Sequence, residues 1–312
     1  MAVTPAAIRE LRELTGSGMS DCKKALEETG GDIKKAVEFL REKGLAAAEK
    51  KSGRIAAEGV VAINIAADNK KAVIVEVNCE TDFVAINPQF KEYVQEIADQ
   101  LIDSPNVENV DAFLEEPWAK DKSQSVSEVL KGKIATIGEN LKIRRFQHFE
   151  KQTPGIYASY LHGGGKIGVV LEIDCNCGSE VVKEMGYNLC MQIAALFPKY
   201  LRVEEVDQDY LASERKILEA AAKNDPANAN KPEQVIEKMI DGRLNKQMKE
   251  ICLLEQEYVK DTSMTVKAYV DSVAKECGCD LKLVRFACFE RGEGIEKKQE
   301  DFAEEVAKAM QG

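Results

Sequence analysis

An internal repeat constrains the fold of this 312-residue chain more strongly than any other feature of its sequence. When residue i is aligned with residue i+96, eight of 43 positions from residue 59 onward are identical, among them Glu76 with Glu172. At an offset of 140, seven of 17 positions match from residue 134 onward, where KIRRFQHFE aligns with KLVRFACFE. Composition alone would give about one to three matches in windows of this size. The sequence therefore predicts two copies of one structural unit, over residues 55–152 and 153–291.

Each copy has the pattern of an antiparallel sheet covered by helices. Residues 59–65 and 71–77 are rich in Val and Ile around an Asp-Asn pair, which is typical of a hairpin turn. A helical pattern and a last strand over residues 141–149 follow. The two offsets differ by 140 − 96 = 44 residues, which we place in the second copy as an inserted helical hairpin over about residues 205–255. We therefore expect an α+β fold with a duplicated core.

The segments that flank the two copies have helical patterns. Residues 1–45 predict a module of three short helices, because glycines separate three apolar patterns with helical spacing. The stretch AAAEKKSGR at residues 46–54 is small and charged, as expected of a solvated linker. Residues 292–312 carry an apolar stripe that predicts a C-terminal helical module.

Charge and apolar content argue against several classes of partner. The chain has 43 Lys and Arg residues against 54 Asp and Glu residues, and the net charge of −11 opposes binding to a phosphate backbone. Its longest apolar runs are too short to span a bilayer, and we identify no secretory leader. Nine cysteines, an odd number, favour reduced thiols over a disulfide framework. We therefore expect a cytoplasmic protein without a membrane or direct nucleic-acid partner.

Three patterns suggest chemistry, but each is incomplete. The HGGGK segment at residues 162–166 lacks the full phosphate-loop pattern and aligns with the hairpin turn of the first copy. Two Cys-x-Cys pairs, which begin at Cys175 and Cys277, could bind a soft metal; structural zinc sites usually have wider spacings, and buried thiols are the simpler interpretation. Nothing places either of the two histidines beside a cysteine as a nucleophilic pair. We expect no catalytic site, metal or cofactor.

The remaining candidate is the junction EVNCETDFVA at residues 76–85, where a strand ends and a helix approaches. Thr81 or Asp82 could cap that helix, and Phe83 could pack in the core. At the same place the second copy has Cys-Gly-Ser at residues 177–179, so the joint does not require an acid followed by an aromatic. Asp82 and Phe83 are therefore candidates for a role beyond the fold.

Two stretches resemble the elongation factor Ts family: LRELTGSGMSDCKKAL at residues 11–26 and EVNCETDFVA at residues 76–85. The duplicated core, the inserted hairpin and the ending FERGEGIEKKQEDFAEEVAK also resemble that family, so the similarity covers nearly the whole chain. The chain departs from the family pattern at Ile86, where the family usually has a basic or amide residue.

The resemblance implies a nucleotide exchange factor rather than an enzyme. Its partner would be elongation factor Tu in the GDP-bound and nucleotide-free states, and the core leaves surface for self-association. In that family the TDFV segment reaches the Mg²⁺ site of elongation factor Tu, the N-terminal helices hold its G domain, and the C-terminal helix also contacts it. The partner-binding residues expected on this basis are Thr81, Asp82, Phe83 and Val84 in the TDFV segment, Leu11, Arg12, Thr15, Gly16, Gly18 and Met19 in the N-terminal module, and Phe302 and Val306 in the C-terminal helix.

Two other classes of function stay open at this point. The three-helix start resembles ubiquitin-associated domains, so residues 1–45 could belong to an adaptor that binds peptides or ubiquitin-like folds. One of the nine cysteines could instead serve a thiol enzyme, which would require a single reactive thiol of low pKa.

Overall fold

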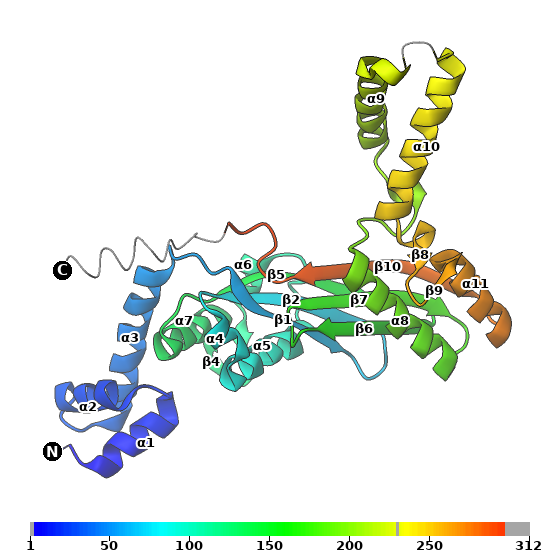
Figure 1. The fold of residues 1–312 in the computed structure, drawn as a ribbon. Coiled ribbons are helices and arrows are strands. Elements are labelled where there is room, and N and C mark those ends of the chain that lie inside the picture. The colour runs from blue at the N-terminus through cyan, green and yellow to red at the C-terminus, as the bar shows by residue number, and fades with distance from the viewer. Residues whose placement is uncertain (1–2, 229–230, 297–312) are drawn as a thin grey trace.

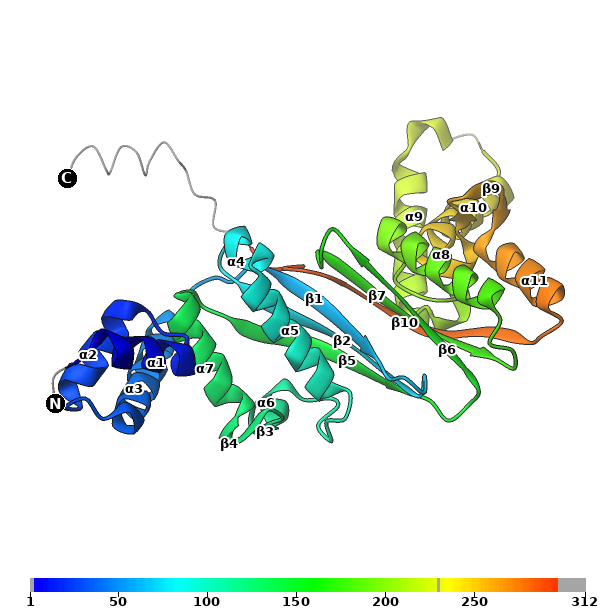
Figure 2. The ribbon, with the colours of Figure 1, turned by 90° about the horizontal axis from the view of Figure 1, so that it is seen from below.

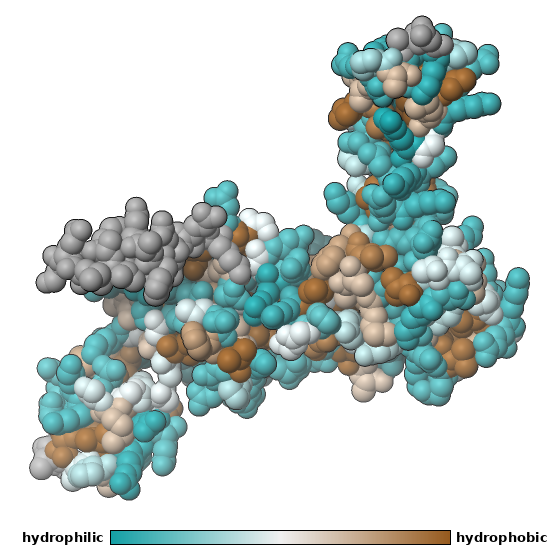
Figure 3. Space-filling view, viewed as in Figure 1, coloured by the Kyte–Doolittle hydropathy of each residue, from teal (hydrophilic) through white to brown (hydrophobic). Residues whose placement is uncertain are grey.

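The computed structural model describes residues 3–228 and 231–296 of the chain. Figure 1 shows three parts: N-terminal helices at one end, two sheets with their helices in the middle, and a helical hairpin that projects at the other end. The same projection is visible in the space-filling view of Figure 3. The sheets are antiparallel and the helices lie outside them, so the prediction of an α+β fold is confirmed. Among the described residues, every helix is too short or too polar to span a lipid bilayer.

The first sheet is built around β2 (Lys71–Cys79), which pairs with β1 (Glu58–Ile65) on one side and β5 (Lys142–Glu150) on the other. Both pairings are antiparallel, and β1 pairs along its whole length without a register shift. The β2–β5 ladder shifts between Glu76 and Val77. Because side chains alternate along a strand, β2 presents one set of residues to each face of the sheet.

The second sheet has the same order of strands. Its central strand β7 (Ile167–Cys175) lies between β6 (Gly155–His162) and β10 (Leu281–Glu290), again with antiparallel pairing. A register shift again interrupts the ladder with the last strand, here between Leu283 and Arg285.

Each sheet carries a long helix on its outer face, as Figure 2 shows. α5 (Pro88–Leu101) buries an apolar stripe on the first sheet, and α8 (Glu180–Leu196) does the same on the second. The shorter elements around the first sheet are α4 (Asp82–Ile86), α6 (Val110–Leu114), β3 (Pro117–Trp118), β4 (Asp121–Ser125) and α7 (Val126–Ile137). Those around the second are β8 (Glu257–Tyr258), β9 (Asp261–Thr265) and α11 (Val266–Cys277).

The inner faces of the two sheets pack against each other. An apolar cluster lies between them, to which the first sheet contributes Ile74 and Phe149 and the second contributes Tyr157 and Val170. The middle of the molecule is therefore layered as helix, sheet, sheet and helix (Figure 2). Burial of both inner faces stabilises the contact by roughly 25 cal/mol for each Å² of apolar surface removed from water.

A buried carboxylate lies in this interface. Glu76 of β2 has no exposed surface. Its oxygens accept hydrogen bonds from Arg145 Nε at 2.6 Å and from Arg144 Nη1 at 3.0 Å, both on β5. The backbone N–H of Gly292, which follows the last strand of the second sheet, donates a third at 2.7 Å. One carboxylate thus binds two strands of its own sheet to the end of the other.

The second sheet holds a corresponding ion pair, in which Glu172 Oε2 accepts a hydrogen bond from Arg285 Nε at 2.8 Å. Each arginine also reaches the opposite sheet. The guanidinium of Arg145 lies 4.3 Å from the ring centroid of Phe289. The guanidinium of Arg285 lies 4.7 Å from that of Phe149. Reciprocal cation–π contacts therefore join the two sheets.

The turn between β6 and β7 contacts the first sheet. Gly163, Gly164 and Gly165 adopt φ angles of 59°, 69° and 96°, which glycine tolerates without steric cost. The N–H of Val61 on β1 donates a hydrogen bond to the carbonyl of Gly165 at 2.8 Å. A Cβ at Gly165 would lie 2.8 Å from Val60 Cγ1. The glycine run therefore permits close packing of this turn on β1.

The N-terminal module consists of α1 (Pro5–Thr15), α2 (Met19–Glu28) and α3 (Ile33–Lys51). Thr4 caps α1 and Asp32 caps α3, each by accepting a hydrogen bond from a backbone N–H three residues later. The three helices bury a small apolar core of their own.

The predicted linker over residues 46–54 is wrong for its first six residues, because α3 continues to Lys51. Alanine, lysine and glutamate are strong helix formers, and Ala48 is buried in the core of the first sheet. Upstream, a Cβ at Gly44 would lie only 3.1 Å from the Cβ of Ala135 on α7. The helix therefore docks the module directly on α7, a contact that composition alone does not reveal.

The projecting hairpin consists of α9 (Gln208–Asn224) and α10 (Glu233–Ile251), within the range predicted for the inserted residues. Val206, Met248 and Cys252 form a small apolar cluster at its base. Three short 3-10 helices accompany it: η1 (Val203–Glu205), η2 (Pro226–Asn228) and η3 (Leu253–Glu255). Most of the module predicted over residues 292–312 lies outside the described residues.

We expect Glu76→Gln to lower the free energy of unfolding by about 3 kcal/mol, the lower end for breaking a buried ion pair, because both arginines stay partly exposed. Desolvation raises the pKa of Glu76, but hydrogen bonds from Gly292, Asn78 and Arg144 outweigh it and hold the pKa below its usual range. The stabilisation is therefore present above about pH 4.3, the pKa of an unfolded glutamate, and is lost as the pH falls below it.

Urea unfolding at several pH values measures this effect. Asp103→Asn is the matched control, because Asp103 pairs with Lys71 of the same strand at 3.0 Å but has a side chain that is 82% exposed. Its loss should cost less than about 1 kcal/mol. Equal effects of the two substitutions would contradict the role given to Glu76.

Candidate functional site

The junction singled out in the sequence forms a short turn and a single turn of helix. β2 ends at Cys79 and α4 begins at Asp82. Thr81 is the N-cap of α4, and its Oγ1 accepts a hydrogen bond from Val84 N at 3.4 Å. Asn87 then ends α4 and caps α5, with its Oδ1 accepting from the N–H of residue 89 at 2.8 Å. α4 is therefore held between two capping residues.

A glutamate from another loop, Glu139, fastens this turn through hydrogen bonds to residues 80 and 81, which we call the Glu139 clamp. Glu139, between α7 and β5, accepts hydrogen bonds from the N–H groups of Glu80 and Thr81, both at 3.0 Å. Its second oxygen accepts from Thr81 Oγ1 at 2.6 Å. In return, Glu80 Oε1 accepts from the N–H of Asn140 at 2.6 Å. Charge-assisted bonds of this kind are roughly twice as strong as neutral ones, so the turn has little freedom.

Glu139 has no recognisable pattern in the sequence around it. Its carboxylate acts on backbone groups 58 and 59 residues away in the chain, and no local pattern reports such a contact. The two alignment offsets contain a usable signal: they place Cys177 opposite Thr81 and Cys279 opposite Glu139, so the two aligned positions differ together.

The fastened turn exposes a large apolar side chain. Phe83 is 79% exposed and Ile86 is 65% exposed, although both lie in the short helix α4 that comes soon after a buried strand. The interpretation that Phe83 packs in the core is therefore wrong. Asp82 is also exposed, and its carboxylate accepts no hydrogen bond from the described residues. An aromatic and a carboxylate thus stand side by side in solvent on a rigid support.

The other two predicted residues face inward. Val84 is partly buried against the core of the first sheet, and Thr81 is occupied by the cap and by Glu139. These side chains hold the turn, whereas Asp82 and Phe83 are available to a partner.

The N-terminal module presents a second surface around the turn between α1 and α2. Gly16 has a φ of 67°, and its N–H closes α1 on the carbonyl of Arg12. Thr15 Oγ1 donates to the carbonyl of Leu11 at 2.7 Å. Arg12, Gly16, Gly18 and Met19 are exposed and Thr15 is half-buried.

Leu11 does not belong to that surface. Its side chain is fully buried in the core of the three helices, so the prediction that it contacts a partner is corrected to a packing role. Leu14, which the spacing of apolar residues groups with Leu11, is instead 63% exposed, and Met19 at the start of α2 is 47% exposed. Phe302 and Val306 lie outside the described residues.

Four of the cysteines have pKa values that do not suit the reactive thiol of a thiol enzyme. Burial raises the pKa of Cys79 and of Cys288 to about 12 and that of Cys252 to about 11. Burial also raises the pKa of Cys175. Thiols with such pKa values carry almost no thiolate at neutral pH.

Comparison with known proteins agrees with the resemblance noted in the sequence. The family model described as "Elongation factor TS" matches residues 80–293. Elongation factor Ts from Clostridium botulinum (strain Alaska E43 / Type E3) is 50% identical over 308 residues, which cover 99% of either chain. Elongation factor Ts from Clostridium tetani is 50% identical over 309 residues, which cover 99% of this chain and all of the relative.

We expect Glu139→Ala to release the turn while leaving the fold intact. Loss of three charge-assisted hydrogen bonds should speed amide exchange at Glu80 and Thr81 by at least about tenfold, which corresponds to ~1.4 kcal/mol of local stability. Hydrogen exchange of the peptide that spans residues 79–86 measures this. Glu108→Ala, which removes an exposed glutamate from another loop, is the control and should leave that peptide unchanged. Unaltered exchange in the Glu139 variant would show that the turn is rigid without the clamp.

Proposed function

This chain belongs to the elongation factor Ts family, and we propose that its exposed pair Asp82 and Phe83 drives release of GDP from elongation factor Tu. Membership of the family makes the chain a nucleotide exchange factor. The single observation that carries the mechanism is the 79% exposure of Phe83 on a turn held by Glu139. Exposure of an aromatic ring to water is unfavourable in the free protein. A partner that buries the ring explains why it is there.

Phe83 acts as a wedge in this proposal. Full burial of a phenylalanine side chain contributes about 1.5–3 kcal/mol, which is available to displace apolar side chains of the partner. Because caps and the Glu139 clamp already fix the turn, little ordering cost is added when Phe83 inserts.

Asp82 acts on the Mg²⁺ site of the partner. Mg²⁺ requires near-octahedral oxygen coordination and keeps several waters, so a carboxylate placed beside it disturbs the polar groups that order those waters. The hold of the ion on the β-phosphate of GDP then weakens. The carboxylate of Asp82 has no hydrogen bond among the described residues to give up when it approaches this site.

Thermodynamic linkage sets the order of events. If the factor lowers the affinity of elongation factor Tu for GDP by some ratio, GDP lowers the affinity for the factor by the same ratio. The complex is therefore tight only when it is nucleotide-free, and entering nucleotide displaces the factor. The chain performs no reaction of its own in this cycle, which distinguishes it from the thiol enzyme considered above.

We also infer that residues 1–45 form a UBA-like module that binds elongation factor Tu rather than an adaptor for other peptides. The exposed residues Arg12, Gly16, Gly18 and Met19 support this assignment, and we add Leu14 to them on the basis of its exposure. Phe302 and Val306 in the C-terminal module, residues 292–312, complete the proposed contacts.

The core over residues 55–152 and 153–291 is best explained as a duplication. β4 (Asp121–Ser125) and β9 (Asp261–Thr265) are separated by the same 140 residues as α7 and α11, and the reciprocal arginine–phenylalanine contacts support the same interpretation.

We further propose that the factor works in the cytoplasm and that copies of the chain can associate through the core. Its net charge of −11 opposes binding to nucleic acid.

Release of a fluorescent GDP analogue from elongation factor Tu tests the main proposal. The unmodified chain should accelerate release, and Phe83→Ala should reduce that acceleration by about 30-fold, as expected when an interface aromatic worth ~2 kcal/mol is removed. Asp82→Ala should reduce it by at least about tenfold, because the effect on Mg²⁺ is lost. No acceleration by the unmodified chain would end the proposal.

Two variants control for nonspecific effects. Asp111 occupies the first turn of α6, which has five residues as α4 does, so Asp111→Ala should exchange like the parent. Leu161→Ala removes a side chain that is 45% exposed on the second sheet and should also act like the parent. If the Asp82 and Phe83 variants matched these controls, the family assignment would stand but the wedge mechanism would be wrong.

The N-terminal contact makes a separate prediction. Met19→Ala should weaken binding to nucleotide-free elongation factor Tu by about fivefold, or ~1 kcal/mol, because part of an apolar side chain is no longer buried. The rate of GDP release at saturating factor should stay within about twofold. A contact that is equally strong before and during GDP release changes the affinity and leaves that rate unchanged. Titration calorimetry measures the affinity, with Leu161→Ala as the control. A changed rate at saturation with unchanged affinity would contradict this role.

A further inference from the structure

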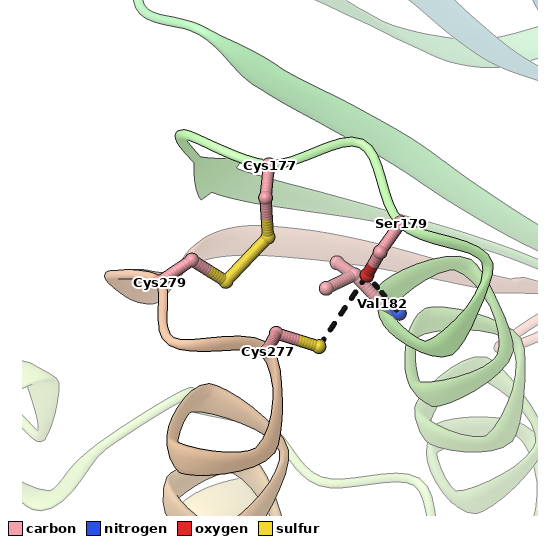
Figure 4. Close-up of a disulfide and its surroundings, with 5 residues drawn as sticks. All are labelled: Cys177, Ser179, Val182, Cys277 and Cys279. Atoms are coloured by element: carbon pink, nitrogen blue, oxygen red, sulfur yellow. Dashed lines mark hydrogen bonds between the residues drawn. A yellow bond between two sulfur atoms is a disulfide. The ribbon is translucent and has the colours of Figure 1, made fainter.

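Three cysteines meet at the end of the second sheet (Figure 4). Cys177 follows β7, Cys277 is the last residue of α11, and Cys279 lies in the turn before β10. Their Sγ atoms all lie within 4.8 Å of one another, and all three residues are half-buried. Cys177 and Cys279 form a disulfide, with Cα atoms 6.2 Å apart. The expectation that all nine cysteines are reduced thiols is thus corrected for this pair.

The cluster takes the place that the Thr81–Glu139 clamp occupies in the first unit. The repeat offsets align Cys177 with Thr81 (81 + 96) and Cys279 with Glu139 (139 + 140). In the first unit, these positions join the strand-to-helix turn to the turn before the last strand. The same two turns in the second unit are therefore joined through sulfur.

We propose that, with its thiols reduced, the cluster of Cys177, Cys277 and Cys279 binds one zinc-type cation. Thiolates prefer soft or borderline cations, and three of them without a carboxylate do not suit Mg²⁺ or Ca²⁺. Zn–S bonds of about 2.3 Å place tetrahedral thiolates roughly 3.8 Å apart, which fits sulfurs within 4.8 Å of one another. Half-burial leaves the fourth position open to water.

The third thiol separates this proposal from a purely structural disulfide. A disulfide uses two sulfurs and gives no reason for Cys277, whose Sγ lies 3.4 Å from Ser179 Oγ at the start of α8. The proposed function also places the chain in a reducing cytoplasm, where structural disulfides are rare. A metal explains all three sulfurs in that compartment.

Zinc binding takes two steps, reduction of the disulfide and then exchange of thiol protons for the metal. A dithiol reductant gives two electrons and two protons to the Cys177–Cys279 bond, which becomes two thiols while the reductant becomes a disulfide. Zn²⁺ then displaces one proton from each of three thiols, so three protons are released and the site carries a net charge of −1. Metal and disulfide are mutually exclusive, because both use Cys177 and Cys279.

Zinc binding to the full chain tests the proposal. The parent is reduced with a dithiol, exposed to Zn²⁺ alone and desalted, and its metal content is measured by native mass spectrometry. About one zinc per chain should remain on the parent and on Cys288→Ser, which alters another half-buried cysteine. Cys277→Ser should lose at least about tenfold in zinc affinity, although it leaves the disulfide pair intact.

Co²⁺ reports the ligands directly. The reduced parent should show thiolate-to-cobalt charge-transfer absorption, which should weaken in each of the variants Cys177→Ser, Cys277→Ser and Cys279→Ser. Zinc should also raise the unfolding temperature of the reduced parent and not that of Cys277→Ser. GDP release is measured in parallel, so failure at this site is distinguishable from failure of the exchange mechanism.

Two results would overturn the proposal. One is a reduced parent that retains no zinc, or that re-forms the disulfide in the presence of Zn²⁺ under a dithiol. The other is zinc that stays on Cys277→Ser as tightly as on the parent. Circular dichroism of each metal-free variant establishes that it is folded.

Discussion

The buried ion pair between Glu76 and Arg145 is the interaction on which the rest of the core depends. A carboxylate without exposed surface is tolerated only when its charge is compensated, and here two arginines and a backbone N–H provide that compensation. Arg145 also lies over the ring of Phe289. The guanidinium that pairs with Glu76 in the first sheet therefore also fixes the position of the second sheet. An apolar cluster alone would allow the sheets to slide, whereas directional bonds at this point define one arrangement.

The turn that presents Asp82 and Phe83 is rigid because the Glu76–Arg145 ion pair joins the two strands that support it. β2 carries Glu76 near its middle and the turn at its end, while β5 carries Arg145 and directly follows the loop with Glu139. Both ends of the clamp therefore belong to strands that one ion pair has already joined. The chain can place an apolar ring in solvent on this support without the turn collapsing onto the core, which is the state that a wedge requires.

Regular elements could be predicted from the sequence, and the contacts between them could not. The i+96 and i+140 alignments located both sheets because strands and turns leave local patterns of valine, isoleucine and glycine. The prediction of a linker at residues 46–51 is wrong because a charged, alanine-rich stretch suits both a linker and a docked helix, and only the contact of Gly44 with α7 decides between them. Leu11 and Leu14 share one helical stripe yet differ completely in burial, and Glu139 acts across nearly 60 residues of chain. The docking of residues 46–51, the burial of Leu11 and the hydrogen bonds of Glu139 all depend on neighbours that are distant in the sequence.

The glycine turn at residues 163–165 has a consequence for how the molecule behaves in a crowded solution. β1 is an edge strand of the first sheet, and an unpaired edge is a template for strands of other chains. The carbonyl of Gly165 already occupies the N–H of Val61, and the turn packs so closely that even a methyl group at Gly165 would strike Val60. One unit thus shields the open edge of the other against edge-to-edge aggregation.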